Sequence, residues 1–98
     1  MSRNCIDRLT IIVVNWNAGH YLRDCIASIS IVKQEGFTIS DVIVVDNGSI
    51  DGSLDGLDQL GTPVHVIKNT ENFGFAAACN QGAAVATGNY FLFLNPDT

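Results

Sequence analysis

Four short runs of apolar residues stand out along the chain, and within each run the apolar residues are continuous rather than alternating with polar ones. Continuous runs rich in Val, Ile and Phe are typical of strands covered on both faces, as in a parallel sheet. We therefore predict four parallel strands. They cover residues 9–14, 41–45, 64–68 and 89–94.

The segments between these strands carry helical patterns. Apolar residues of segment 21–32 recur at the spacing of one helix face, and segment 53–60 allows a short helix with leucines on one side. Segment 75–86 is rich in Ala, a strong helix former, and Gly88 stands where that helix would end. Strands that alternate with helices predict right-handed crossovers and an open α/β sheet, for which we expect the strand order 3-2-1-4.

Composition and charge narrow the class of protein. The chain has 98 residues, of which 47% are hydrophobic and 15% charged, as expected for one globular domain. A net charge of −5 argues against nucleic acid as a partner. No apolar stretch approaches the roughly 20 residues of a membrane span. The three cysteines are widely spaced, which indicates neither a disulfide framework nor a zinc site and favours a cytoplasmic setting, including the inner face of the membrane.

Polar residues gather directly after each predicted strand. Because the carboxyl ends of parallel strands face the same way, these clusters are expected to meet at one edge of the sheet. Ligands of open α/β sheets bind at that edge, above all where the strand order reverses. With the order 3-2-1-4, the reversal brings Asn15 and Asn17 near Asp97. The four clusters cover residues 15–17, 46–49, 69–74 and 95–97.

The first two clusters each have a functional and a structural interpretation. Asp46 could accept hydrogen bonds from a ribose hydroxyl or a base N–H, as an acidic residue does at this place in dinucleotide-binding folds. Asp-Asn-Gly-Ser is also turn chemistry, so Asp46 could instead bond amides of its own loop. Trp16 could stack beneath a ligand or pack at the strand end. The phosphate-binding fingerprints G-x-G-x-x-G and G-x-x-x-x-G-K-[ST] are both absent.

The last two clusters offer a turn and a pair of oxygen ligands. Asn72 and Gly74 suit a tight turn that opens the Ala-rich helix, whose N-terminus can hold an anion. Asn80, a polar residue in an apolar segment, either ties down a neighbouring loop or touches the ligand. Asn95 and Asp97 could hold Mg²⁺ or Mn²⁺ on a diphosphate, although Asn-Pro-Asp is also turn chemistry.

Four motifs that contain these residues follow one another in a fixed order. They read Val13-Val14-Asn15-Trp16-Asn17, Val45-Asp46-Asn47-Gly48-Ser49-x-Asp51-Gly52-Ser53, Asn72-x-Gly74-Phe75-Ala76-x-Ala78-x-Asn80-x-Gly82 and Phe91-Leu92-Phe93-Leu94-Asn95-Pro96-Asp97. Together they resemble the amino-terminal half of a family 2 glycosyltransferase with the Rossmann-like GT-A fold, in a rhamnosyltransferase-like version. The resemblance runs from about residue 9 to residue 98.

The resemblance implies an enzyme that transfers a sugar, with inversion, from a nucleotide diphosphate donor to a hydroxyl of a glycan or lipid-linked acceptor, as in polysaccharide biosynthesis. It implies that Asp46 recognises the base or ribose and that Asp97, with Asn95, binds Mg²⁺ or Mn²⁺ on the diphosphate. The common family motif has an acid at both metal positions, and Asn95 is neutral. The nucleotide pocket would comprise Asn15, Trp16, Asn17, Asp46, Asn47, Ser49, Asp51, Asn72, Gly74 and Asn80.

The resemblance also bears on what the chain can do alone. The family's general base and acceptor-binding wall lie in a carboxy-terminal half, so no catalytic base is assigned here. We expect residues 1–98 to be a donor-binding part, inactive alone, that can self-associate through its uncovered fourth strand. The alternative is a non-catalytic nucleotide-binding or scaffold module of the same fold. A receiver-like domain would need a Lys after a later strand, which is absent.

Overall fold

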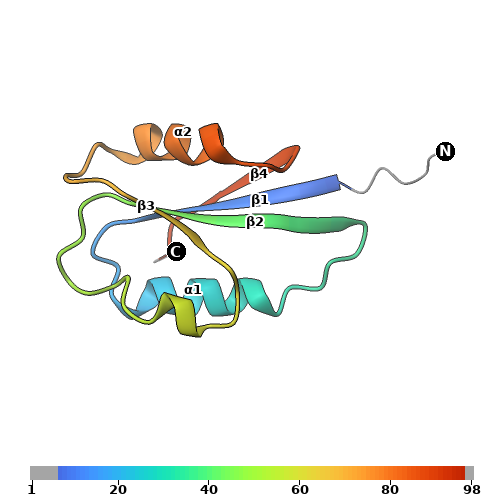
Figure 1. The fold of residues 1–98 in the computed structure, drawn as a ribbon, viewed down its shortest axis with the longest axis horizontal. Helices are drawn as coiled ribbons and strands as arrows, with labels where there is room; N and C mark the ends of the chain where they lie inside the picture. The colour runs from blue at the N-terminus through green and yellow to red at the C-terminus, as the bar shows by residue number, and fades with distance from the viewer. Residues whose placement is uncertain (1–6, 97–98) are drawn as a thin grey trace.

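The computed structural model describes residues 7–96, and its strands form a single parallel sheet (Figure 1). The strand order is β3-β2-β1-β4, as predicted, and all three strand pairs are parallel. Helix α1 lies on one face of the sheet and α2 on the other (Figure 1). The elements are β1 (Asp7–Asn15), α1 (His20–Ser30), β2 (Phe37–Asp46), the 3₁₀ turn η1 (Leu57–Gln59), β3 (His65–Lys68), α2 (Phe75–Val85) and β4 (Tyr90–Leu94).

The core lies on both faces of the two central strands, which explains their continuous apolar runs. Ile11 and Val13 of β1 pack in the cluster on the α1 face, while Ile12 and Val14 pack on the α2 face. Successive side chains of a strand point to opposite faces, so a strand covered on both sides needs apolar residues at every position. The apolar runs thus predicted the two central strands correctly.

The structure differs most from the predicted elements at the start of β2 and in segment 53–60. Strand β2 begins at Phe37 rather than at residue 41, because its pairing with β1 continues past the end of the core. The predicted helix over 53–60 is only the short turn η1. Gly52 and Gly56 adopt positive φ angles of 77° and 76°, a backbone conformation that interrupts a helix.

Helix α2 lies unusually close to the sheet at Gly82. A Cβ atom added at Gly82 would stand 2.6 Å from Cγ2 of Ile12, which is fully buried in β1. Glycine is therefore required at this position for the helix to pack at its observed distance.

Strand β4 remains largely exposed, as the sequence predicts. Within the described residues it pairs with β1 alone, and its apolar side chains from Tyr90 to Phe93 are 41–57% exposed. No helix between residues 7 and 96 combines the length and the apolar content needed to cross a bilayer.

Asp41 ties the connection between α2 and β4 to the amino end of the sheet. Its carboxylate accepts hydrogen bonds from the Thr10 hydroxyl, from Ser40 Oγ at 3.0 Å and from the Thr87 amide at 3.1 Å. Burial alone raises the pKa of Asp41, but these hydrogen bonds outweigh it and hold the pKa below its ordinary value.

We expect Asp41→Asn to lower the melting temperature near neutral pH by roughly 4 °C, because the amide replaces an acceptor with a donor. A depressed pKa in the folded state means that the charged form stabilises the fold above the unfolded pKa of about 3.9. That contribution disappears as the pH falls through the lower folded value. Melting curves from pH 7 to pH 2.5 should therefore show the two proteins converging below about pH 4. Asp24→Asn, at an exposed position of α1, is the control, and parallel curves for Asp41→Asn would contradict the assignment.

Candidate functional site

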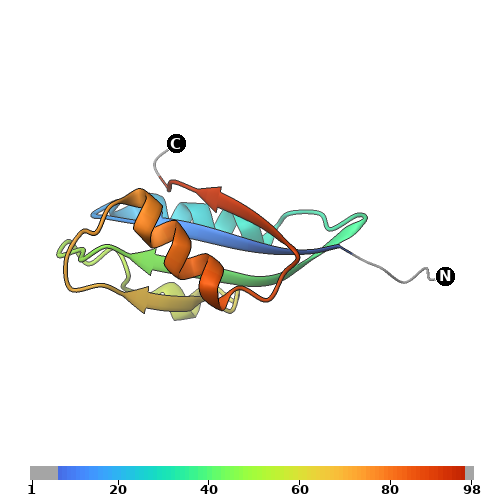
Figure 2. The ribbon, with the colours of Figure 1, turned by 90° about the horizontal axis from the view of Figure 1, so that it is seen from above.

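The loops that follow β1, β2 and β3 lie together at one end of the molecule, as predicted (Figure 2). We call this end, formed by residues 15–19, 46–53 and 69–74 with Asn95 after β4, the rim. Asn47 N donates to Asn15 O at 2.8 Å and Asn69 N donates to Asp46 O at 2.8 Å, so the pairing of the strands continues into these loops. Three of the four polar clusters are thereby held in contact.

Asp46 is buried at the rim and is bonded within the protein. Its side chain is 3% exposed, and Oδ1 accepts hydrogen bonds from Asn15 Nδ2 at 2.8 Å and from Ser49 Oγ at 2.6 Å. Oδ2 accepts from the Ser49 amide at 3.0 Å. The turn interpretation of Asp46 thus describes its contacts correctly, and contact with a ligand remains a prediction for this carboxylate.

Asn17 and Asp51 connect the first and second loops. Asn17 has a φ of 50°, which is uncommon outside glycine, and its Oδ1 accepts from the Ile50 amide at 2.9 Å. Asp51 accepts from the Gly19 amide, just before α1, at 2.9 Å. Hydrogen bonds, the largest contribution coming from Ser53 and a further one from Gly19, hold the pKa of Asp51 below its ordinary value. Both residues lie at the rim, and both brace loops.

A cluster of three amide side chains fixes the third loop. Asn69 and Gln81 form a reciprocal pair, Nδ2 to Oε1 and Nε2 to Oδ1, each at 2.8 Å. Asn69 Nδ2 also reaches Asn47 Oδ1 at 3.0 Å, and Asn47 Nδ2 donates to Gly74 O at 3.2 Å. Asn69 belongs to the polar cluster predicted after β3, whereas Gln81 was not predicted as a site residue. Asn80, the residue of this helix predicted to tie down a loop or touch the ligand, is exposed and takes no part in the cluster.

The turn before α2 forms as predicted. Asn72 Oδ1 accepts from the Gly74 amide at 2.8 Å, and Gly74 has a φ of 90°, in the region that favours glycine. The turn leads directly into α2 at Phe75. Asn72 and Phe75 line one recess together with Val14 at the end of β1.

A small recess of about 200 Å³ opens at the rim next to this turn. Trp16 and Phe75, which are 57% and 52% exposed, supply two aromatic side chains to it. Trp16 is thus available for stacking rather than packed away at the strand end. Phe75 was not predicted as a site residue, although it directly follows the Gly74 turn. The other lining residues are Val14, Ala18, Asn47, Asn72 and Asn95, so all its polar side chains are neutral amides.

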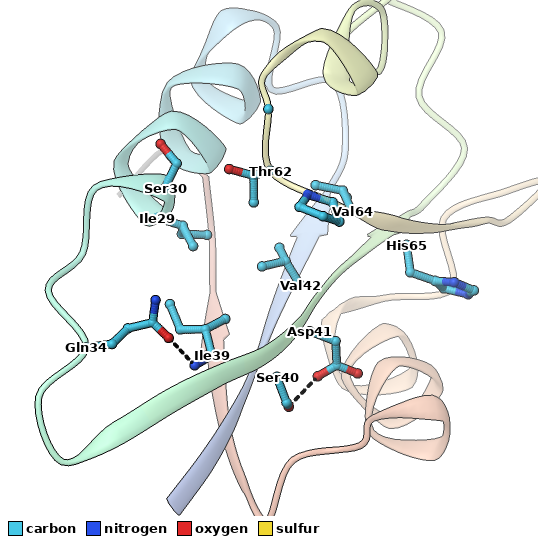
Figure 3. A pocket seen from close by; sticks show the side chains of 12 residues that line it. Ile29, Ser30, Gln34, Ile39, Ser40, Asp41, Val42, Thr62, Val64 and His65 are labelled. Atoms are coloured by element: carbon cyan, nitrogen blue, oxygen red, sulfur yellow. Dashed lines mark hydrogen bonds between the residues drawn. The ribbon is translucent and has the colours of Figure 1, made fainter. Parts of the chain in front are cut away.

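A larger groove, of about 480 Å³, lies at the opposite end of the strands (Figure 3). Its central residues include Ile29, Val42 and Val64, and its one carboxylate, Asp41, is already occupied by the hydrogen bonds described above. Gln34 is likewise bonded to the Ile39 amide at 2.7 Å. Its serines Ser30 and Ser40 are bonded to backbone carbonyls as well. We therefore take the rim, where the loops at the carboxyl ends of the strands converge, as the candidate site.

The structure describes one of the two predicted metal ligands. Asp97 lies outside the described residues, while Asn95 lines the recess and can offer one neutral oxygen. Between residues 7 and 96 no group of three or more His, Cys, Asp or Glu could hold a metal ion. The described residues alone do not form a metal centre.

A family model and individual known proteins that resemble the chain point to the same family. The family model described as Glycosyl transferase family 2 matches residues 10–98. The chain is 36% identical over 93 residues to glycosyltransferase GlyA of Streptococcus pneumoniae, covering 93% of this chain and 13% of that protein. It is 32% identical over 96 residues to a teichoic acid poly(glycerol phosphate) polymerase of Staphylococcus epidermidis, covering 94% of this chain and 13% of the polymerase.

A solved structure shares the fold. The mannosyltransferase PcManGT of Pyrobaculum calidifontis, in complex with GDP-Man and Mn²⁺, superposes with a TM-score of 0.79 at 23% identity. The match covers 96% of this chain and 28% of the mannosyltransferase, so the chain spans well under a third of the length of each of these three proteins. The expected GT-A topology is confirmed.

Proposed function

The chain belongs to glycosyl transferase family 2, and from this premise we propose that it supplies the nucleotide-sugar-binding part of a glycosyltransferase. The observation that carries the proposal is the recess at the end of β1, where the strand order reverses and where Trp16 and Phe75 meet amide side chains. Aromatic faces suit a base or sugar ring, and amides suit its hydrogen-bonding edge. Hydrogen bonds between the loops around the recess hold them in place in the absence of a ligand.

The reaction we propose is transfer of a sugar, with inversion, from a nucleotide diphosphate donor to a hydroxyl of a glycan or lipid-linked acceptor. In this proposal Asp46 and the residues bonded to it shape the base or ribose side of the site, and Trp16 stacks on the donor. The Asn95-Pro96-Asp97 motif favours a donor sugar of the rhamnosyltransferase-like class. These finer assignments draw on the resemblance of the motifs.

Trp16→Ala should weaken the binding of a nucleotide diphosphate about tenfold while leaving the melting temperature unchanged, because stacking contributes roughly 1–3 kcal/mol and Trp16 is exposed. Isothermal titration calorimetry with UDP, GDP and dTDP, each with and without Mn²⁺, measures both the preferred base and the loss. Tyr21→Ala is the matched control, since Tyr21 is a similarly exposed aromatic on α1 and does not line the recess. Equal affinities for Trp16→Ala and the unaltered chain would remove Trp16 from the site.

We further propose that the donor is bound with a divalent cation, a proposal supported by the Mn²⁺ in the mannosyltransferase complex and by the sequence position of Asp97. An acidic chain has little positive charge of its own to offset a diphosphate. A bound Mg²⁺ or Mn²⁺ would supply that charge.

Asp97→Ala should abolish the difference between nucleotide affinities measured with and without Mn²⁺. Asp58→Ala, a carboxylate on η1 away from the rim, should leave that difference intact. If the affinity of the unaltered chain never depends on Mg²⁺ or Mn²⁺, the role given to Asp97 is wrong.

Sugar transfer itself is tested with the preferred donor and a divalent cation, both with this chain and with the protein expressed from its complete reading frame. Binding of the nucleotide without transfer from any donor would favour the non-catalytic module over the enzyme. The exposed apolar side chains of β4 also support the proposal that the chain can associate with itself through that strand.

A further inference from the structure

Asn15, the last residue of β1, is completely buried although its side chain is polar. Its Nδ2 lies 2.8 Å from Asp46 Oδ1, 2.8 Å from Ser53 Oγ and 3.1 Å from Ser49 Oγ. All three oxygens belong to the loop that follows β2, and the two hydrogens of the amide are shared among them. A buried side chain with this set of partners holds the loop and does not present itself to a ligand at the surface.

The orientation of this amide is determined by Asp46. Asn15 Oδ1 is buried and has no hydrogen-bond partner among the described residues. Rotating the amide by half a turn would aim that oxygen at the carboxylate of Asp46, where two acceptors would oppose each other. The observed orientation leaves one acceptor unpaired and keeps the donor on the charged group, where a hydrogen bond is strongest.

The bond from Asn15 differs in kind from the other bonds to Asp46. The Ser49 amide and hydroxyl belong to the same loop as Asp46, three residues further on, so their bonds to Asp46 are internal to that loop. Asn15 comes from the neighbouring strand and adjoins Trp16, which lines the recess. Other bonds also join this loop to β1 and its loop, but among the bonds that the described residues make to the Asp46 carboxylate itself, the one from Asn15 alone comes from the strand that ends at the recess.

We propose that Asn15 is a positioning residue, which holds the carboxylate of Asp46 and the Ser49 turn in register with the recess without touching the donor. The inference rests on the proposed donor-binding function for its effect on affinity. Its structural half, the fixing of the Ser49 turn by Asn15, stands on the distances alone. The two halves can be measured separately.

The first measurement is hydrogen exchange of the Ser49 amide, followed by NMR in the 98-residue chain without ligand. We expect exchange about tenfold faster or more in Asn15→Ala and in Asn15→Asp, which sets two carboxylates against each other. The exchanged pair Asn15→Asp with Asp46→Asn restores one donor facing one acceptor and should return the rate to within about threefold of the original. Ser53→Ala, which removes a partner of Asn15 but leaves Asp46 bonded, is the control.

The second measurement is the affinity for the preferred nucleotide diphosphate. We expect Asn15→Ala to weaken it between about 10-fold and 100-fold, as for loss of a hydrogen bond to a charged group. Unchanged Ser49 exchange in a folded Asn15→Ala chain would overturn the inference, and so would unchanged affinity. Absence of nucleotide binding by the unaltered chain would instead reject the proposed function, while the exchange data would still decide whether Asn15 fixes the turn. If Asn15→Asp does not fold, Asn15→Ala supplies both readouts.

Discussion

Asp46→Ala is expected to lower the free energy of unfolding by about 3 kcal/mol and to reduce nucleotide binding below detection. The substitution leaves buried Asn15 Nδ2 without its charged acceptor and removes both bonds from Ser49. Asn15 Nδ2 keeps Ser53 Oγ and Ser49 Oγ as partners, but a hydrogen bond to a charged group contributes about 1.5–3 kcal/mol, so the loss of three such bonds at one point should be large. Urea denaturation followed by far-UV circular dichroism measures the stability, and calorimetry measures the binding.

Asp51→Ala provides the comparison in the same loop. Its carboxylate also accepts backbone amides, but it is exposed, so water can replace the lost bonds. We expect a smaller change in stability than for Asp46→Ala. Equal denaturation midpoints for Asp46→Ala and the unaltered chain would contradict the structural role of the buried carboxylate.

Gly82→Val should destabilise the fold by about 3 kcal/mol, at the upper end for overpacking a core. The first added carbon already falls 2.6 Å from Ile12 Cγ2 and 3.3 Å from Cγ1. Ile12 is paired on both sides, with Ile43 of β2 and Phe93 of β4, so β1 cannot move away to make room. Helix α2 would have to lift from the sheet. Urea denaturation measures the loss.

Ala84→Val, at an exposed position of the same helix, carries the same β-branched side chain without the clash. We expect it to cost well under 1 kcal/mol, which is its difference in helix propensity. Combining Gly82→Val with Ile12→Ala should destabilise less than the sum of the two single changes, because the shorter side chain at position 12 leaves room for the valine. Strict additivity would show that the loss has another origin.

Much of the fold was predictable because both central strands are covered on both faces. That arrangement forces continuous apolar runs such as residues 11–14 and 42–45, and these runs are visible without knowledge of any contact. The predicted helix over 53–60 is shortened to η1 because Gly56, inside the segment, adopts a positive φ angle that the leucine spacing does not reveal. Local backbone conformation outweighed the apolar pattern there.

The position of the site was predictable from the sequence, but the contacts between its residues were less so. Parallel strands bring Asn15, Asp46 and the Gly74 turn to one end, a consequence of topology alone. The burial of Asp46 and the pairing of Asn69 with Gln81 depend on how loops close over one another, and no spacing in the sequence encodes that. A polar side chain in an apolar helix was a fair signal of a loop contact, but the prediction named Asn80, and its neighbour Gln81 makes the bond.

The reciprocal pair of Asn69 and Gln81 lowers the conformational entropy that the third loop can lose when a ligand binds. Because this pair and Asn47 clamp the segment from Asn69 to Gly74 onto α2 and β2, that segment has few conformations left to lose on association. Binding at such a prebuilt surface carries a small entropic penalty. Under the proposed function, discrimination between donors would then come from the fit of the ligand to a rigid shape rather than from the closing of a flexible loop around it.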